Sequence, residues 1–290
     1  MIFRQILRSF PILQAIRMRV CAGPPAHCMN LSLSIVCKNS IATIGRTLDS
    51  VRGLVTEVVA VDSGSTDGTI ELLERHGARV ICSEWLGHIR TKQKALEACS
   101  GDWVLCLDSD ESLEPELAAA IRAVVDDGSG HLSPSGFAMN RRTYYRGRPL
   151  RYAWQPEWRV RLVRRGHAAW GGHDPHDVLA LTDGVPTRLL GHLRHDSFPT
   201  FAEHLRKQWH HASTMAASLH AAGRRGSYLR LLTSPTGAFV KQLVVKRGFL
   251  DGYPGWLAAA STASGALMKH AMLIELSCTA HDTGSPGSTD

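Results

Sequence analysis

The stretch from residue 31 to about residue 130 alternates short apolar runs with longer amphipathic stretches, and this alternation restricts the possible folds more than any other feature. The short runs are rich in β-forming residues and predict four strands, at 31–37, 55–62, 78–83 and 103–108. The stretches after them predict four helices, at 41–51, 69–77, 89–100 and 114–127. Strand-to-helix units repeated in this way are typical of a parallel α/β sheet of the nucleotide-binding kind.

Polar side chains follow three of the predicted strands, at the point where each strand ends. They occupy residues 38–40, 62–68 and 108–111. In open α/β sheets, ligands bind beyond the carboxyl ends of the strands. We therefore expect these three segments to converge on one crevice that holds the ligand.

Asp108 and Asp110 lie two residues apart at the end of an extended strand, so their carboxylates can point to the same side. A hard cation such as Mg²⁺ or Mn²⁺ takes one or two carboxylates and completes its coordination shell with water and substrate phosphates. The pair therefore predicts a metal site that neutralises a departing diphosphate. The alternative is a capping turn before the helix that begins near Pro115.

Asp62 ends the second predicted strand, and rigid backbone carries it into the same crevice. Its carboxylate can accept hydrogen bonds from a base N–H or from ribose hydroxyls. Asp67 has the sequence context of a helix N-cap, and we favour that structural role over ligand contact.

Three segments, LSIVCKNS, EVVAVDSGSTDGT and KQKALEACSGDWVLCLDSDE, together resemble the opening of the glycosyltransferase family 2 domain. The resemblance implies a GT-A fold that uses a nucleotide-diphosphate sugar, UDP-linked, with a divalent metal. The resemblance implies that the donor is bound by Asn39, Asp62, Lys92 and Asp108. It implies that the metal is bound by Asp108 and Asp110. Ser40 follows Asn39 where the family usually has an acidic residue, which leaves the contact at the first strand open.

A strongly basic strip follows the α/β region: nine arginines lie between residues 141 and 165 against a single acid, Glu157. Aromatic residues are interleaved with them, and aromatic faces suit sugar rings while arginine forks suit phosphate. The strip predicts an acceptor site for an anionic glycan, or else an aromatic core with solvated arginines. The candidate residues of this acceptor site are Arg159 and Arg161 in the strip, together with Trp170 and His176 after it. Nucleic acid is not expected, because no recognition-helix or RNA-binding motif accompanies the strip.

An inverting sugar transfer needs a base that deprotonates the acceptor hydroxyl, and the segment AAWGGHDPHDVL at 168–179 offers two carboxylates. We predict Asp177 as the base, with Asp174 or a cap-forming role as alternatives. The order RLVRR, Trp170, His176-Asp177 resembles a family branch with RLFRR, a Trp and a His-Glu pair. Asp replaces the Glu of that branch, and its shorter side chain leaves the choice between Asp177 and Asp174 open.

This order, continued by HDSFPTFAEHLRKQW, resembles the bacterial lipopolysaccharide core glycosyltransferases of the kind that add glucose to an inner-core heptose. The resemblance implies a hexosyltransferase acting on phosphorylated inner core, which agrees with the arginine strip. Alternatives are transfer to a polyprenyl phosphate and a non-catalytic nucleotide-sugar-binding protein at a membrane surface. A nucleotidyltransferase would need a glycine-rich phosphate loop, and CKNSIATIGR is not one.

The chain divides into four segments on these grounds. Residues 29–198 form the expected GT-A domain, and residues 199–278 have a helical pattern with little strand signal. Residues 1–28 are either a basic amphipathic segment or a non-native extension, and residues 279–290 are expected to be disordered.

The helical segment combines apolar, aromatic and basic residues. Its spacing places Phe201, Leu205, Trp209 and Ala212 on one face of a helix. The stretch 238–276 predicts contact with an anionic membrane surface, or alternatively packing on the catalytic domain or on a second subunit. No apolar run approaches the roughly 20 residues that span a bilayer. The resemblance to the lipopolysaccharide enzymes implies a cytoplasmic protein, peripheral on the inner face of a Gram-negative inner membrane, and the net charge of +7 suits that location.

The seven cysteines form no CxxC pair and are odd in number, which favours a reducing cytosol over a disulfide framework. Cys37, Cys82 and Cys106 lie in or at the ends of predicted strands, where we expect them to act as small buried apolar residues. The fifteen histidines lack the spacing of a zinc site.

Overall fold

The structure is a computed structural model that describes residues 29–127, 134–173, 176–196 and 200–282. The side chains of His173, His176 and residues 279–282 are not among those described. The predictions made for residues 1–28, for Asp174 and for residues 283–290 therefore lie outside the described residues.

The first half of the sheet is parallel, as the strand-to-helix alternation predicts. Strands β1 to β4 pair in the order β3-β2-β1-β4, all parallel. Helices α1 to α3 connect them, and Gly77, with a φ of 73°, ends the segment after α2. The bounds are β1 (Leu31–Cys37), α1 (Ile41–Ser50), β2 (Glu57–Asp62), α2 (Thr69–Arg75), β3 (Arg79–Cys82), α3 (His88–Glu97) and β4 (Trp103–Asp108).

The second half of the sheet is mixed and joins the first half through β8, which pairs antiparallel with β4. The order continues as β8-β6-β11-β5, with β7 on β6, while β9 and β10 form a separate hairpin that packs beside α3. The bounds are β5 (Glu111–Leu113), α4 (Pro115–Asp126), β6 (Gly136–Tyr145), β7 (Arg148–Pro149), β8 (Trp158–Arg164), β9 (Ala168–His173), β10 (His176–Leu181) and β11 (Thr187–His195). The arginine strip therefore lies mainly on β6 and β8, and of these β8 is the neighbour of β4.

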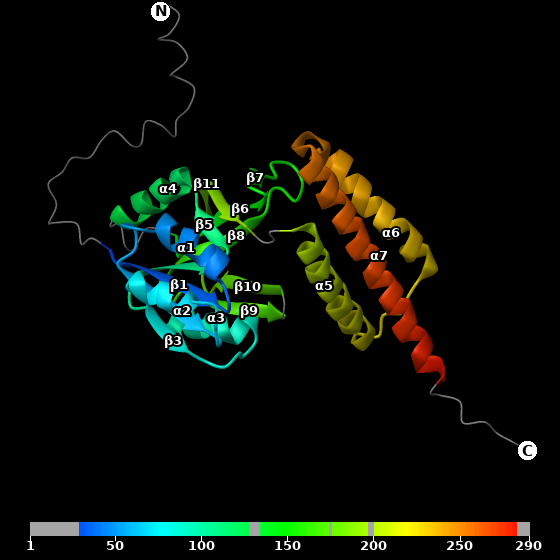
Figure 1. The fold of residues 1–290 in the computed structure, drawn as a ribbon, viewed down its shortest axis with the longest axis horizontal. Helices are drawn as coiled ribbons and strands as arrows, with labels where there is room; N and C mark the ends of the chain where they lie inside the picture. The colour runs from blue at the N-terminus through cyan, green and yellow to red at the C-terminus, as the bar shows by residue number, and fades with distance from the viewer. Residues whose placement is uncertain (1–28, 128–133, 174–175, 197–199, 283–290) are drawn as a thin grey trace, which may run out of the picture.

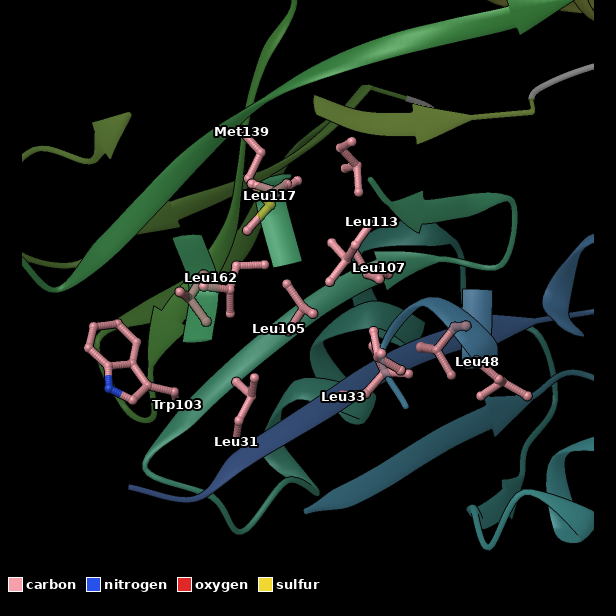
Figure 2. Packing of buried hydrophobic residues seen from close by; sticks show 14 of the residues in the cluster. Leu31, Leu33, Leu48, Trp103, Leu105, Leu107, Leu113, Leu117, Met139 and Leu162 are labelled. Atoms are coloured by element: carbon pink, nitrogen blue, oxygen red, sulfur yellow. The ribbon is translucent and has the colours of Figure 1, made fainter. Parts of the chain in front are cut away.

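The main core fills the space between the sheet and its helices (Figure 2). Leu31, Leu33 and Leu105 of the central strands are fully buried, and Trp103 at the start of β4 packs against Phe137. Central strands of such a sheet are covered on both faces, which explains why β1 and β4 are apolar along nearly their whole length.

The C-terminal region is helical, as predicted. It comprises α5 (Phe201–Ala221), α6 (Tyr228–Val240), a π-helical turn (Lys241–Val245), a 3₁₀ turn (Gly248–Asp251) and α7 (Tyr253–Asp282). Helix α7 packs between α5 and α6, and α6 lies farthest from the sheet (Figure 1). Among the described residues, no helix is both long and apolar enough to cross a bilayer.

The prediction of which residues share the buried face of α5 is partly wrong. Trp209 is exposed, whereas the buried residues of α5 are His204, Ala212 and Ala216. Small residues let α5 approach α7 closely, and a Trp side chain on that face would hold the helices apart.

The predicted α/β class and the helical C-terminal region are confirmed, and one cysteine prediction is wrong. Cys37 and Cys106 are buried as expected, but Cys82 is exposed. It ends β3, which is the edge strand of the sheet and has only one neighbouring strand. An alternating apolar run does not reveal whether its strand lies at an edge.

Candidate functional site

A cavity of about 550 Å³ lies at the carboxyl ends of β1 and β4. Its walls come from the β1–α1 and β4–β5 loops, α3, β10 and α5, so both the α/β domain and the helical region contribute. Polar residues that line it include Lys38, Lys92, Asp108, Asp110, Asp177, His195, Lys207 and His211. The polar ends of the first and fourth predicted strands therefore meet in one cavity, as expected, whereas no residue of the polar segment 62–68 is in its described lining.

Lys92 joins the two predicted functional carboxylates. Its Nζ lies 2.6 Å from Oδ1 of Asp108 and 2.8 Å from Oδ2 of Asp177. The three side chains come from α3, β4 and β10, and only 12–26% of each is exposed. Nζ also lies 4.7 Å from the centre of the Trp170 ring, which attracts the ammonium through its π face.

The charged forms of Lys92 and Asp108 stabilise each other. Burial favours the neutral amine of Lys92, but the carboxylates of Asp108 and Asp177 hold its pKa above the ordinary value. Burial likewise opposes the charge of Asp108, yet Arg161 and Lys92 hold the pKa of Asp108 far below its ordinary value. Lys92 is therefore an ammonium and Asp108 a carboxylate at neutral pH.

Arg161 supports the site from behind. Its guanidinium donates to both carboxylate oxygens of Glu111, at 2.9 and 2.8 Å, and to Oδ2 of Asp108 at 3.0 Å. Arg161 and Glu111 are almost completely buried. Trp170 is also buried and lies against Lys92 and Arg161. Arg161 and Trp170 thus position Asp108 and Lys92, while their predicted acceptor contact stays a prediction.

A second cavity, of about 400 Å³, adjoins the first and shares Asp108 and Asp177 with it. The other residues that line it come from the arginine strip, β10 and α5, and some of them also line the first cavity: Arg141, Arg159, Arg161, Val178, Gln208 and His211. Glu157 partly balances this charge, because Arg141 and Arg159 both donate to it, at 2.6 and 2.8 Å. Arg159 therefore lies where an anionic group beside Asp177 would need it.

Glu157 should make the stability of the fold depend on pH in the acid range. Although burial favours the protonated acid, Arg141 and Arg159 lower the pKa of Glu157 from 4.5 to about 2. Its contribution to stability is complete above pH 4.5 and is lost as the pH falls toward 2. The loss of stability caused by Glu157→Gln should accordingly shrink on acidification, as measured by urea unfolding between about pH 7 and pH 3. For the exposed Glu74→Gln, we expect a small change that does not vary with pH; equal profiles for the two variants would contradict the prediction.

Asp110 faces His195, whose Nε2 lies 3.5 Å from Oδ2 of Asp110. Burial opposes the charge of Asp110, but His195 lowers its pKa. Among the described residues, no group of three or more His, Cys, Asp or Glu side chains is placed to hold a metal ion. Such a group is needed for zinc, whereas Mg²⁺ and Mn²⁺ bind through one or two carboxylates with water and phosphate oxygens. Asp108 and Asp110 both line the open cavity, but each oxygen of Asp108 contacts Lys92 or Arg161, so a hard cation at this pair stays a prediction.

Asp62 and Asn39 have a different place. Asp62 is fully buried, and its carboxylate accepts hydrogen bonds from the backbone N–H of Gly64 and Ser65, at 2.9 and 2.8 Å. Asn39, with a φ of 50°, accepts from the backbone N–H of Thr66 at 2.9 Å. Neither is in the described lining of the two cavities; they hold the β1–α1 and β2–α2 loops together, and their donor contacts stay predictions.

Asp67 has a structural role, as favoured from the sequence, but the N-cap of α2 is Gly68 and not Asp67. Asp67 accepts from the backbone N–H of Ile41 at 3.0 Å and from that of Thr69 at 3.1 Å, which ties the starts of α1 and α2 together. Its side chain is therefore engaged within the protein.

The sequence did not reveal the contribution of α5. Lys207, Gln208 and His211 line the first cavity, and Gln208 and His211 also line the second. Their i, i+1, i+4 spacing marks one side of a helix, but only the packing of α5 shows that this side faces the cavities. The backbone of the predicted residue His176 pairs with that of His173, where β9 ends and β10 begins.

A family profile matches the first part of the chain, and individual proteins resemble most of its length. The profile of glycosyl transferase family 2 matches residues 32–180, slightly more than half of the chain. An uncharacterized glycosyltransferase of Rickettsia typhi is 29% identical over 258 residues, covering 85% of this chain and 87% of the relative. The lipopolysaccharide core biosynthesis glycosyltransferase LpsC of Rhizobium meliloti is 28% identical over 267 residues, covering 83% of this chain and 93% of the relative.

Among solved structures, glucosyl-3-phosphoglycerate synthase of Mycobacterium tuberculosis was crystallised with Mn²⁺, uridine diphosphate and glucosyl-3-phosphoglycerate. It is 28% identical to this chain, with a TM-score of 0.31 over 41% of this chain and 45% of that one. The family match over half of the chain, with glycosyltransferases as relatives over most of its length, shows that this protein is a glycosyltransferase of family 2.

Proposed function

We propose that this protein transfers glucose from UDP-glucose to the phosphorylated inner core of lipopolysaccharide, with inversion at the anomeric carbon. The observation that carries the proposal is the Lys92 bridge, which holds Asp108 of the donor motif and the predicted base Asp177 around one cavity. The inner-core acceptor is supported by the similarity to LpsC over most of both chains. Glucose and UDP rest on the family resemblance of the sequence motifs.

The donor diphosphate would bind on the side of the cavity formed by Lys92, Asp108 and Asp110. Lys92 is an ammonium and can bind a diphosphate oxygen as a point charge. Asp108 and Asp110 would hold a Mg²⁺ or Mn²⁺ ion, which when bound supplies positive charge to the departing diphosphate. Asp62 and Asn39 would shape the loops at which the nucleoside binds.

Asp177 would act as the base. As the acceptor oxygen forms its bond to the anomeric carbon, the bond from that carbon to the diphosphate breaks, and Asp177 takes the hydroxyl proton. Lys92 Nζ lies 2.8 Å from Oδ2 of Asp177 and so fixes the position of the carboxylate beside the donor side of the cavity. A carboxylate held at that place can accept the proton of an acceptor hydroxyl that enters the cavity.

The second cavity would take the anionic acceptor. Arg159 is partly exposed beside Asp177, and Arg141, Gln208 and His211 complete the wall. An arginine fork binds a phosphate group through two hydrogen bonds and so fixes its orientation. An acceptor phosphate held there would place a neighbouring hydroxyl near Asp177.

The acceptor proposed here is part of a lipid-anchored glycan, so we also propose that the protein acts as a peripheral protein on the inner face of the inner membrane. A donor site formed by the α/β domain and an acceptor cavity walled by α5 would then lie close to the membrane surface.

Calorimetric titration with UDP tests the donor half. We expect UDP to bind in the presence of Mn²⁺, and binding to weaken at least about tenfold with a chelator or in Asp110→Asn. The reason is that the metal site would lose the charged carboxylate of Asp110. Asp108 would keep its contacts with Lys92 and Arg161.

Asp126→Asn is the matched control, because Asp126 is exposed at the end of α4, and its UDP affinity should be unchanged. Equal UDP binding with Mn²⁺ and with chelator would reject the metal. Failure of UDP, GDP and dTDP to bind under any condition would reject the donor site itself.

A further inference from the structure

Helix α6 and the turn that follows it expose an unusually apolar surface. Helix α6 packs mainly against α7, and none of its residues is buried. It is the outermost helix of the C-terminal region, turned away from the sheet (Figure 1). The side of α6 opposite α7 therefore faces solvent.

The exposed apolar side chains are arranged on one side. Leu229, Leu232, Val240 and Val244 follow one another at intervals of three, eight and four residues, which keeps them on one side of a helix. Leu229 and Leu232 are 71% and 72% exposed. The turn and the start of α7 add further exposed side chains. We call the whole set the apolar face: Leu229, Leu232, Val240, Val244, Val245, Phe249, Leu250, Tyr253 and Trp256.

The segment that carries most of the apolar face is basic. Residues 228–250 contain four lysines and arginines and no aspartate or glutamate. Asp251 is the next acid, and its carboxylate accepts hydrogen bonds from three consecutive backbone N–H groups, at Arg151, Tyr152 and Ala153. Lys241 and Arg247, which flank the turn, are exposed. The segment from Tyr228 to Leu250 therefore has a net positive charge of its own.

We propose that the apolar face docks on an anionic membrane surface, with its apolar side chains in the boundary between headgroups and acyl chains and its basic side chains on anionic headgroups. This arrangement satisfies both features of the surface, since buried apolar area and attraction to anionic lipid add together. Tyr253 and Trp256 suit the boundary, because each has an apolar ring and a polar group. Pairing with a second copy of the chain would instead bring two segments of net positive charge together.

The inference names the surface for the peripheral location proposed above, and it does not depend on the transfer reaction. Membrane binding and UDP binding involve separate residues and can be measured separately. The failure of one proposal therefore leaves the other intact.

Vesicle flotation of the full chain tests the surface. We expect binding to vesicles of phosphatidylcholine with phosphatidylglycerol, and weaker binding to phosphatidylcholine alone. The variant Leu229→Ser/Leu232→Ser should lower the partition coefficient at least about tenfold, because two large apolar side chains no longer enter the membrane. The variant Lys241→Ser/Arg247→Ser should remove most of the preference for phosphatidylglycerol, and so should high salt.

The control is Leu190→Ser, which removes an equally exposed leucine from β11 in the α/β domain and should bind as the wild type. UDP binding should be unchanged in all these variants, which verifies that each is folded. Wild-type vesicle binding by both double variants would overturn the proposal. So would sedimentation showing that the leucine substitutions convert a dimer to a monomer while vesicle binding persists.

Discussion

Replacing Asp177 with Asn is expected to lower the transfer rate by a factor of about 10² to 10⁴, because the reaction loses the group that accepts the hydroxyl proton. The carboxylate of Asp177 is partly exposed to both cavities and has Lys92 as its ion-pair partner. Asn keeps the size of the side chain and a hydrogen-bonding oxygen but cannot take up a proton. The measurement is the initial rate of glucose transfer from UDP-glucose to purified rough lipopolysaccharide.

Three further measurements separate this chemical role from a structural one. Asp177→Asn should still bind UDP, since Asp108 and Lys92 remain paired. Asp177→Glu should keep much of the activity, because it restores a carboxylate of the kind found in the related branch. Asp183→Asn, an exposed aspartate just beyond the same hairpin, should transfer glucose at the wild-type rate. An Asp177→Asn protein that keeps more than about a tenth of the wild-type rate would be incompatible with Asp177 as the base.

Replacing Arg161 with Met should lower the free energy of unfolding by about 3–5 kcal/mol. The substitution leaves the fully buried Glu111 without its bidentate partner and weakens the support of Asp108. Methionine fills most of the space of the aliphatic part of Arg161, so the loss arises mainly from the uncompensated charge. Urea unfolding at neutral pH measures the change.

Arg159→Met is the matched control for this effect. Arg159 lies two residues away on the same strand and also pairs with a glutamate, Glu157, but its side chain is 38% exposed compared with 5% for Arg161. The substitution should cost no more than about 1 kcal/mol, because water screens exposed ion pairs. Adding Glu111→Leu to Arg161→Met should recover part of the lost stability, since it removes the unpaired buried charge. Equal losses for Arg161→Met and Arg159→Met would contradict this account of Arg161.

The arginine strip shows that the local sequence reveals where positive charge lies but not which group each arginine binds. Arg141 and Arg159 bind Glu157 within the strip, while Arg161 is buried between Glu111 and Asp108. All three look equivalent in the sequence. Whether such an arginine meets a ligand or an internal carboxylate depends on which acids the neighbouring strands bring to it.

Asp62, a predicted donor-site residue, likewise has contacts that its local sequence does not reveal. Its position at the end of β2 followed from the sequence, because strand ends and turn residues are local signals. Its burial and its hydrogen bonds to the Ser63–Ser65 loop did not, because they depend on how the chain turns back over the strand end. Likewise, a helical period predicted α5 but placed Trp209 on the wrong face.

The sequence by itself determined the four strand-to-helix units, the α/β class, the glycosyltransferase family and the polar strand ends, since these depend on periodicity and on motifs of neighbouring residues. Only the tertiary structure joined Lys92 to Asp177, which lies 85 positions later, buried the Arg161–Glu111 pair and brought α5 to the cavities. The physical reason is that ion pairing and burial depend on distances in space. Those distances are set by the packing of the whole chain and have no signature in the local sequence.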